Sequence, residues 1–484
     1  MAKLQGRPLG AAAEQEPISP PGRGNRVRPV GKFLQPVTAN RDCCRARKKR
    51  VIHKAKTNFV WMFGDRCVRL TIGVVVTALV ARELGSADFG ILMFVTAIVT
   101  VVAAAVPLGM DSLATREIIN DPTSAGQWIG TLLGFRLISA LGGILATLLA
   151  IAISRPDEAQ ATVLGVIMAV GLLGQALEGA EIAFIAGSAM PTLIVPRLIF
   201  LICMATGRVA MIHFALSVEW FAVASSIEHI IAGAITIRYL RLWKGKDWLL
   251  SFDRNKGISL LRVSWPLALS GLSVILYMKL GQLMVGTTLG DKALGAYAVG
   301  TKIPEALAFL PTILASAALP NIVRARSAGR IEYNRTLLRN LRISCLLGYA
   351  TAAALTLLCE PIIQFLFGPE YKSAAHLMAV FSWSAVFAFV GMARGQFLMN
   401  EKRTRLALAL SVTGLAINIA ALVIGIHFGG LSGVVLASVV AYGLAAVATS
   451  FVFEFTREFG RMQLIALVTP WKAVNYPFPR LWNR

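Results

Sequence analysis

The chain has 484 residues, of which 56% are hydrophobic and only 15% charged, and its mean hydropathy is +0.66. Soluble domains carry about 25% charged residues, so the composition excludes a soluble domain as the main body of the chain. The formal net charge of +23 is partly concentrated in residues 1–57, for which we expect a basic, disordered cytoplasmic tail resting on anionic lipid. Because this tail lacks interleaved aromatic residues, we expect no nucleic-acid partner.

Apolar runs of about 20 residues recur along the chain, and each is long enough to cross about 30 Å of hydrocarbon as an α-helix. The alternating pattern of a membrane β-strand does not occur. The sequence therefore predicts an all-α polytopic membrane protein with about twelve transmembrane helices. Their expected limits are 58–81, 90–110, 128–153, 161–186, 190–213, 217–239, 264–287, 295–320, 341–366, 376–399, 405–426 and 430–453.

A short phrase occurs twice between these runs. Leu84–Gly90 (LGSADFG) opens the second expected span, and Leu289–Gly295 (LGDKALG) opens the eighth, at a constant offset of 205 residues. Self-similarity at a fixed offset indicates an internal structural repeat. We expect two six-helix lobes related by an axis along the membrane normal. The predicted domains are the tail 1–57, an N-terminal lobe 58–240, a cytoplasmic linker 241–263, a C-terminal lobe 264–453 and a cytoplasmic tail 454–484.

Lysine and arginine gather in alternate loops. They follow the expected sixth, eighth and tenth spans and recur in the C-terminal tail, whereas the other loops hold few cations. By the positive-inside rule, both termini are predicted to lie in the cytoplasm, with the protein in the inner (plasma) membrane.

Charged side chains inside a span cost at least about 2.5–3.5 kcal/mol, so each one indicates a partner or a function. The expected spans contain more cations than acids, and this excess predicts an electropositive, water-filled cavity for an anionic head group. The candidate substrate-binding residues are Arg66, Arg69, Arg136, Lys279, Lys302 and Arg394. Acidic residues of the spans that could pair with them include Glu178, Glu181, Glu228, Glu305 and Glu360, and Asp65 lies in the first span with Arg66 and Arg69.

Plainer roles stay open for these charges. Arg66 is close enough to the cytoplasmic interface for its side chain to reach it. Lys302 and Glu305 are three residues apart and could pair with each other. Glu178 and Glu181 could cap a helix end beside a loop.

Sequence motifs of catalysis do not occur. We find no P-loop, no dinucleotide-binding glycine motif and no His-Glu-x-x-His, and the six cysteines form no Cys-x-x-Cys pair. We therefore expect a protein that is not an enzyme and that uses no cofactor or metal.

Several phrases, taken in order, resemble the polysaccharide biosynthesis flippases of the multidrug/oligosaccharidyl-lipid/polysaccharide (MOP) exporter superfamily. They are Ala81–Gly90, Leu108–Asp111 with Arg116, Trp265–Gly271, Leu294–Tyr297, Phe367–Tyr371 and Gly429–Ser438. The likeness covers roughly residues 55–455 and implies a MATE-like fold. It also implies translocation of a polyprenyl-diphosphate-linked oligosaccharide from the inner to the outer leaflet, for O-antigen or exopolysaccharide synthesis. A polysaccharide polymerase and glycosyltransferases are the partners that this function implies.

One residue departs from the family pattern. Gly281 stands where members often carry an acid in the seventh span, which leaves the coupling ion open. A cation-coupled multidrug exporter of the same superfamily is an alternative, and it calls for acids and aromatic residues in the lumen. A membrane glycan polymerase or ligase is less favoured because no large extracytoplasmic loop is expected. A lipid II flippase calls for about two further spans, and residues 462–468 are too few to supply them.

Overall fold

A computed structural model of the chain describes residues 38–245, 251–401 and 403–473. Two compact units divide the chain, Met1–His53 and Lys54–Arg484, and the features below belong to the second. The described residues form helices and no strands. Of the predicted basic tail, residues 1–37 lie outside the described part, and α1 begins at Thr38.

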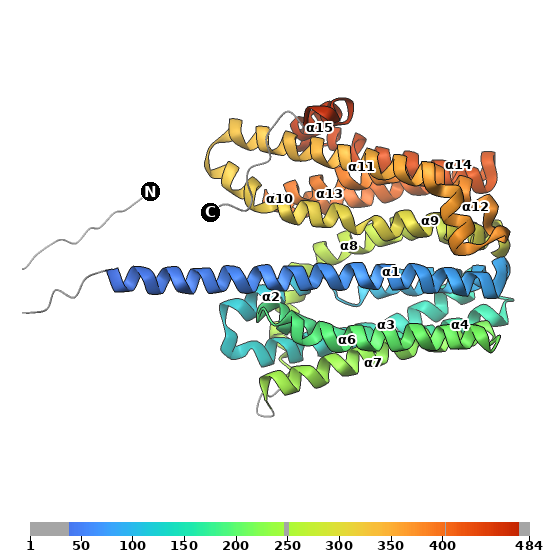
Figure 1. Ribbon diagram of the computed structural model, residues 1–484, viewed down its shortest axis with the longest axis horizontal. Coiled ribbons are helices and arrows are strands. Elements are labelled where there is room, and N and C mark those ends of the chain that lie inside the picture. The colour runs from blue at the N-terminus through green and yellow to red at the C-terminus, as the bar shows by residue number, and fades with distance from the viewer. Residues whose placement is uncertain (1–37, 246–250, 402, 474–484) are drawn as a thin grey trace, which may run out of the picture. The chain divides into compact units, whose positions relative to one another are not determined.

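The N-lobe consists of α1, within the second unit, and α2 to α7 (Figure 1). Its elements are α1 (Thr38–Ala105), α2 (Asp111–Asn120), the 3-10 turn η1 (Pro122–Ser124), α3 (Ala125–Ser154), α4 (Ala159–Glu178), α5 (Glu181–Ala186), α6 (Met190–His213) and α7 (Val218–Lys244).

The C-lobe consists of α8 to α14, and α15 follows it. The elements are α8 (Arg254–Thr288), α9 (Asp291–Leu307), α10 (Phe309–Ser327), α11 (Arg330–Phe367), η2 (Pro369–Tyr371), α12 (Lys372–Phe381), α13 (Ser384–Asn400), α14 (Thr404–Ala446), η3 (Ala448–Phe451), α15 (Glu454–Val468) and η4 (Pro470–Ala473).

Nine helices of the described part are long and apolar enough to cross a membrane, or ten if the pair bent by 42° between α12 and α13 is one span. Two of them contain a residue with non-helical backbone angles, Gly85 in α1 and Gly430 in α14. In α14 the halves pack against each other, because Gly425 contacts Gly433 and Gly414 contacts Ala445. Division of α1 and α14 at these glycines gives the predicted twelve crossings, and the all-α fold in two lobes is confirmed.

The turns that open the second and eighth crossings have the same backbone geometry. Gly85 has φ 69° and ψ 176°, and Gly290 has φ 81° and ψ 177°. Glycine adopts positive φ without the steric cost that a Cβ would bring. The two copies of the repeated phrase therefore fold alike. We call the end of the second unit that holds these turns the Gly85 end, and the opposite end, where α7 is joined to α8, the linker end.

The largest cluster of buried apolar residues joins the lobes at one end. The largest cluster lies at the Gly85 end and includes Val95 and Leu172 of the N-lobe with Val299 and Phe367 of the C-lobe. Toward the linker end each lobe has its own cluster, one around Phe184 in the N-lobe and another in the C-lobe. The hydrophobic packing thus holds the lobes together at the Gly85 end, and toward the linker end it connects them only through Leu260 and Leu261 of α8.

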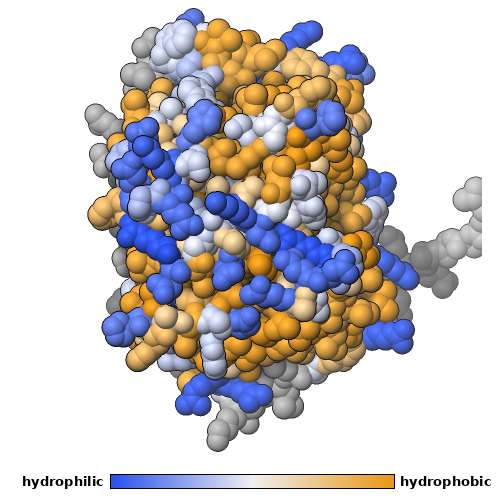
Figure 2. Space-filling view, turned by 90° about the vertical axis from the view of Figure 1, so that its right-hand side faces the viewer, coloured by the Kyte–Doolittle hydropathy of each residue, from blue (hydrophilic) through white to orange (hydrophobic). Residues whose placement is uncertain are grey.

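Large apolar side chains cover the flanks of the helices. Leu145 is 70% exposed and Leu357 81%, a pattern that would favour aggregation in water but suits contact with acyl chains. Figure 2 shows that hydrophilic side chains gather across the Gly85 end, with apolar side chains around them. The chain is a multi-pass membrane protein.

The first turns of α8 pack on the N-lobe. Asp253 accepts hydrogen bonds from the backbone amides of the first turn, and its own amide donates to Thr131 Oγ1 at 2.9 Å. Phe252 stacks on Phe135 at 5.8 Å between ring centroids, and Ser264 Oγ donates to the Leu108 carbonyl at 2.9 Å. One continuous helix therefore spans from the N-lobe surface into the C-lobe.

Candidate functional site

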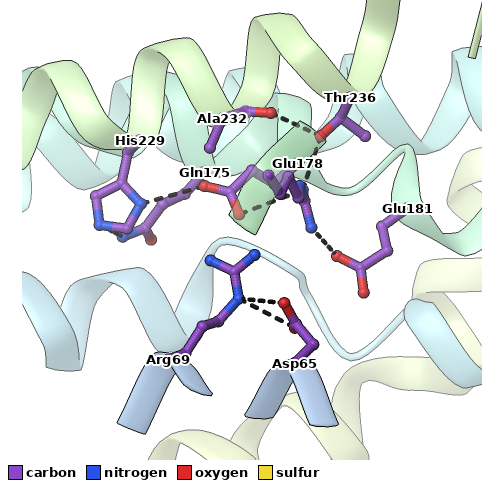
Figure 3. A network of polar contacts seen from close by, with 9 residues as sticks. Asp65, Arg69, Gln175, Glu178, Glu181, His229, Ala232 and Thr236 are labelled. Atoms are coloured by element: carbon purple, nitrogen blue, oxygen red, sulfur yellow. Dashed lines mark hydrogen bonds and ion pairs between the residues drawn. The ribbon is translucent and has the colours of Figure 1, made fainter. Parts of the chain in front are cut away.

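The interior of the N-lobe contains a network of charged side chains (Figure 3). On α1, Arg69 Nε donates to both carboxylate oxygens of Asp65 at 3.0 Å. The pair forms because residues four apart lie on one face of a helix. The free end of the Arg69 guanidinium points toward Glu178 on α4. Arg69, predicted from the sequence, thus lies at the edge of this network.

Arg197 of α6 connects two acids that flank a helix break. Its Nη1 lies 2.5 Å from Glu181 Oε2, and its Nη2 lies 3.5 Å from Glu178 Oε2 and 2.7 Å from Thr236 Oγ1. Glu178 ends α4 and Glu181 opens α5, so the interruption of the fourth span lets both carboxylates approach one guanidinium. The sequence analysis did not select Arg197. Its position two residues after Val195, inside an apolar run, was a usable signal.

His229 of α7 extends the network toward α4. Its Nε2 lies 3.1 Å from Gln175 Nε2, and its Nδ1 lies 3.1 Å from Glu178 Oε1. An amide nitrogen only donates, so Nε2 accepts and the Nδ1–H donates to the carboxylate. The sequence analysis gave His229 no role.

A cavity of about 270 Å³ lies beside these groups, lined by α1, α4, α6 and α7. An ion pair stands in its wall, with Arg208 Nη2 2.6 Å from Glu228 Oε2. Lys302 also lines the cavity although it belongs to α9 of the C-lobe. Both lobes thus contribute charged side chains to one polar space.

The C-lobe places a second ion pair near the boundary between the lobes. Lys279 Nζ on α8 lies 2.6 Å from Glu305 Oε2 on α9 and 3.4 Å from Gln282 Oε1. Gln282 in turn donates to the Met93 carbonyl of the N-lobe at 2.9 Å. Glu305 is therefore bound to Lys279, and the pairing of Glu305 with Lys302 that the sequence left open does not form.

The geometry explains the departure at Gly281. A Cβ at this position would overlap the Tyr297 hydroxyl, so an acidic side chain has no room there. Glu305 supplies a carboxylate to Lys279 from the neighbouring helix instead. The charge of Lys279 is balanced by a residue 26 positions away in the chain, which the local sequence pattern does not reveal.

Two predicted residues serve local packing. Arg136 is 6% exposed and pairs with Asp111 at the start of α2. Arg394 Nη1 donates to the Ala445 carbonyl at 2.8 Å and to Thr449 Oγ1 at 2.6 Å, where α14 ends. Neither lines the cavity. A role of Arg136 or Arg394 in binding remains a prediction.

Arg66 is exposed on α1, and Arg66 and Lys302 form no ion pair among the described residues. Carboxylates pair with Arg69, Arg136 and Lys279, whereas Arg394 donates to backbone carbonyls and hydroxyls, so three of the predicted cations have no ion-pair partner among the described residues. In the part of the chain that the structure describes, no group of three His, Cys, Asp or Glu side chains could hold a metal ion.

Comparisons with known proteins agree with this fold. A family described as "Polysaccharide biosynthesis protein" matches residues 79–376, more than half of the chain. No curated protein matches the sequence. Similar solved structures include an inward-facing multidrug resistance MATE family transporter of the MOP superfamily, with TM-score 0.58, 17% identity and coverage of 83% of this chain and 95% of that one.

Two further solved structures belong to the same superfamily fold. The lipid II flippase MurJ in an inward closed conformation has TM-score 0.62 and 13% identity, with coverage of 88% of this chain and 94% of MurJ. A mutant of the Vibrio cholerae MATE transporter VcmN has TM-score 0.57 and 17% identity, with coverage of 85% and 99%. These identities show the fold, and the fold is the one expected from the resemblance.

Proposed function

The chain belongs to the polysaccharide biosynthesis protein family, and from this premise we propose that it is a flippase for a lipid-linked oligosaccharide. The cargo would be a polyprenyl-diphosphate-linked glycan that moves from the inner to the outer leaflet for O-antigen or exopolysaccharide synthesis. The lobes would open alternately to the two sides of the membrane. A polymerase and glycosyltransferases would act after and before this step.

The observation that carries the proposal is the polar space shared by the lobes. Lys302 extends from the C-lobe into a cavity otherwise lined by the N-lobe, and its charge has no carboxylate partner among the described residues. A half-buried ammonium without an ion-pair partner is costly, so it favours an anionic ligand that would neutralise it. A diphosphate held between the lobes meets this requirement while its lipid tail stays in the bilayer.

The other cations near the cavity are paired with carboxylates, and this pairing favours release of the cargo. Carboxylates already pair with Arg69, Arg208 and Lys279. These carboxylates would compete with the diphosphate for the cations, so the diphosphate would be bound weakly. An inside-negative potential drives an anion outward by about 2.3 kcal/mol per charge for each 100 mV. The membrane potential would therefore suffice to bias movement of a diphosphate without nucleotide hydrolysis.

The proposed orientation follows from the basic loops. Arg326, at the end of α10, lies 3.0 Å from Glu401 at the end of α13, and Arg330, at the start of α11, lies 2.8 Å from Glu458 of α15. These basic segments therefore meet at the linker end. By the positive-inside rule this end faces the cytoplasm of the inner membrane, with both termini there, and the Gly85 end faces outward.

A cation-coupled multidrug exporter is the second candidate. It is favoured by Glu228 in the cavity wall together with the rings of Phe89 and Phe221, since carboxylates and aromatic faces bind organic cations. The exporter would move such cations across proteoliposome membranes in exchange for protons or sodium.

The test uses purified protein in proteoliposomes with a fluorescent polyprenyl-diphosphate oligosaccharide and an impermeant quencher that reports its leaflet. We expect flipping that accelerates with an imposed potential. Replacement Arg69→Ala, Lys279→Ala or Lys302→Ala should slow it about tenfold, with Arg335→Ala on the exposed surface as the control. Unchanged flipping in the three variants removes them from the site, whereas organic-cation transport without lipid flipping selects the exporter.

A further inference from the structure

The two copies of the repeated phrase lie against each other. A Cβ at Gly90 would overlap the backbone oxygen of Asp291, and a Cβ at Gly295 would overlap the backbone oxygen of Ser86. The offset of 205 residues that relates Gly90 to Gly295 also relates Ser86 to Asp291. Each phrase thus offers its glycine to the first-turn carbonyl of the other, as a pseudo-twofold axis between the lobes requires.

This crossing allows backbone-to-backbone contact between two helices. Small residues let helices approach closely inside a membrane, and Cα–H groups then contact carbonyl oxygens. Gly85 and Gly290 turn the chain immediately before each crossing helix, so the two first turns meet in the same orientation. A side chain at Gly90 or Gly295 cannot be accommodated by a rotamer change, since the atoms that it meets belong to the partner backbone.

Side chains from both lobes secure the crossing. Arg155, the residue that follows α3, lies 2.6 Å from Asp291 Oδ1, and its guanidinium stands 4.1 Å from the ring centre of Phe94. From the C-lobe, Glu370 Oε1 accepts from the Ser86 amide at 2.9 Å, and Tyr371 donates to the Ala81 carbonyl at 2.9 Å. These contacts span the boundary between the lobes at the Gly85 end.

At the linker end the lobes are connected differently. Here the hydrogen bonds between N-lobe and C-lobe, within the described residues, come from the first turns of α8, such as Asp253 to Thr131 and Ser264 to Leu108. The apolar clusters are separate there and shared at the Gly85 end. The structure is therefore closed between the lobes at the Gly85 end.

We infer that the repeated phrases form one glycine seam, made of Ser86, Gly90, Asp291 and Gly295, which closes the Gly85 end and parts when the protein opens outward. The inference rests on the proposed alternation of the lobes but not on the identity of the cargo. It gives the duplicated motif a physical purpose, because only a pair of glycines at equivalent positions lets both first turns cross at backbone distance. The ion pair between Arg155 and Asp291 stabilises the closed seam.

The test measures distances between spin labels in purified protein in lipid nanodiscs, in a background without the six native cysteines. Labels at Asp157→Cys and Ser373→Cys report the Gly85 end, and labels at Asn120→Cys and Ala328→Cys report the linker end, since all four positions are exposed. We expect one short distance at the Gly85 end of the parent protein. Gly90→Ala or Gly295→Ala should raise a longer-distance population roughly tenfold or more and shorten the distance at the linker end.

The matched controls are Gly142→Ala in the N-lobe and Gly271→Ala in the C-lobe, because a Cβ at either position meets nothing within 4 Å. Equal distance distributions in seam and control variants overturn the inference. If the seam variants fail to fold, Arg155→Gln provides the test, because it removes the ion pair with Asp291 and keeps both glycines. An unchanged distance at the Gly85 end in this variant then overturns the inference. The distance measurement uses no cargo. Its result therefore stands even if the flipping assay of the proposed function is negative.

Discussion

The polar interiors of the two lobes differ in what surrounds them. In the N-lobe, Arg208 and Glu228 line a cavity, so water can reach their charges. In the C-lobe, Arg394 is enclosed by the end of α14 and donates mainly to backbone carbonyls and hydroxyls. Cations inside a membrane protein thus serve either a pathway or a helix end, and the type of hydrogen-bond acceptor distinguishes the two.

The largest expected effect that would test this difference is on Arg394. Arg394→Ala leaves the Ala445 carbonyl and Thr449 without their donor, so we expect a loss of about 3 kcal/mol or more in stability, seen as a lower thermal unfolding midpoint in detergent. Arg335→Ala on the surface serves as the control. An unchanged unfolding midpoint with abolished flipping would show that Arg394 binds the cargo. The proposed difference between Arg394 and the cavity cations of the N-lobe would then be wrong.

A smaller effect compares two ion pairs, Lys279–Glu305 at the lobe boundary and Arg208–Glu228 in the cavity wall. Lys279→Met leaves a carboxylate without a partner and should cost about 3 kcal/mol, and Glu305→Met in addition should recover most of it. Arg208→Met should cost only about 1 kcal/mol, because cavity water can solvate Glu228. Chemical unfolding of single and double variants measures both couplings, and equal coupling energies would show that the cavity gives no solvation.

The smallest expected effect lies outside the membrane, at Asp121 in the loop before α3. Hydrogen bonds from the Ser124 and Thr123 hydroxyls lower the pKa of Asp121 from 3.8 to about 2. A lowered pKa in the folded state adds stability above pH 3.8 that is lost as the pH falls toward 2. The difference in unfolding midpoint between the parent and Asp121→Asn should thus be constant from about pH 7 to pH 5 and shrink below about pH 4. A difference that grows on acidification would contradict the assignment.

The sequence revealed the features that repeat or that are local. The offset between Gly85 and Gly290 predicted two lobes, because a duplicated turn needs the same residue at the same place. The apolar runs predicted the crossings, since a helix of fixed rise must span a fixed thickness. Asp65 and Arg69 are four residues apart on one helix, so their pairing lies within reach of sequence reasoning.

The ion pairs between helices were beyond that reasoning. Arg197 finds Glu178 and Glu181 through a break in the fourth span, and nothing in the sequence fixes how the broken ends meet. Glu305 has a lysine three residues before it but binds Lys279 on another helix, because the Lys302 side chain turns toward the N-lobe cavity. Helix rotation decides such choices, and the pattern of apolar residues specifies rotation only coarsely.

Helix α8 has a consequence for protein engineering. Its first turns, through Asp253 and Ser264, bind α3 and the turn before α2, although the remainder of the helix belongs to the other half of the molecule. A chimaera that exchanges halves between two relatives should therefore keep residues 251–265 matched to the donor of the α2–α3 surface. A crossover placed after Pro266, where the helix already lacks one backbone hydrogen bond, would preserve that recognition and disturb the ladder least.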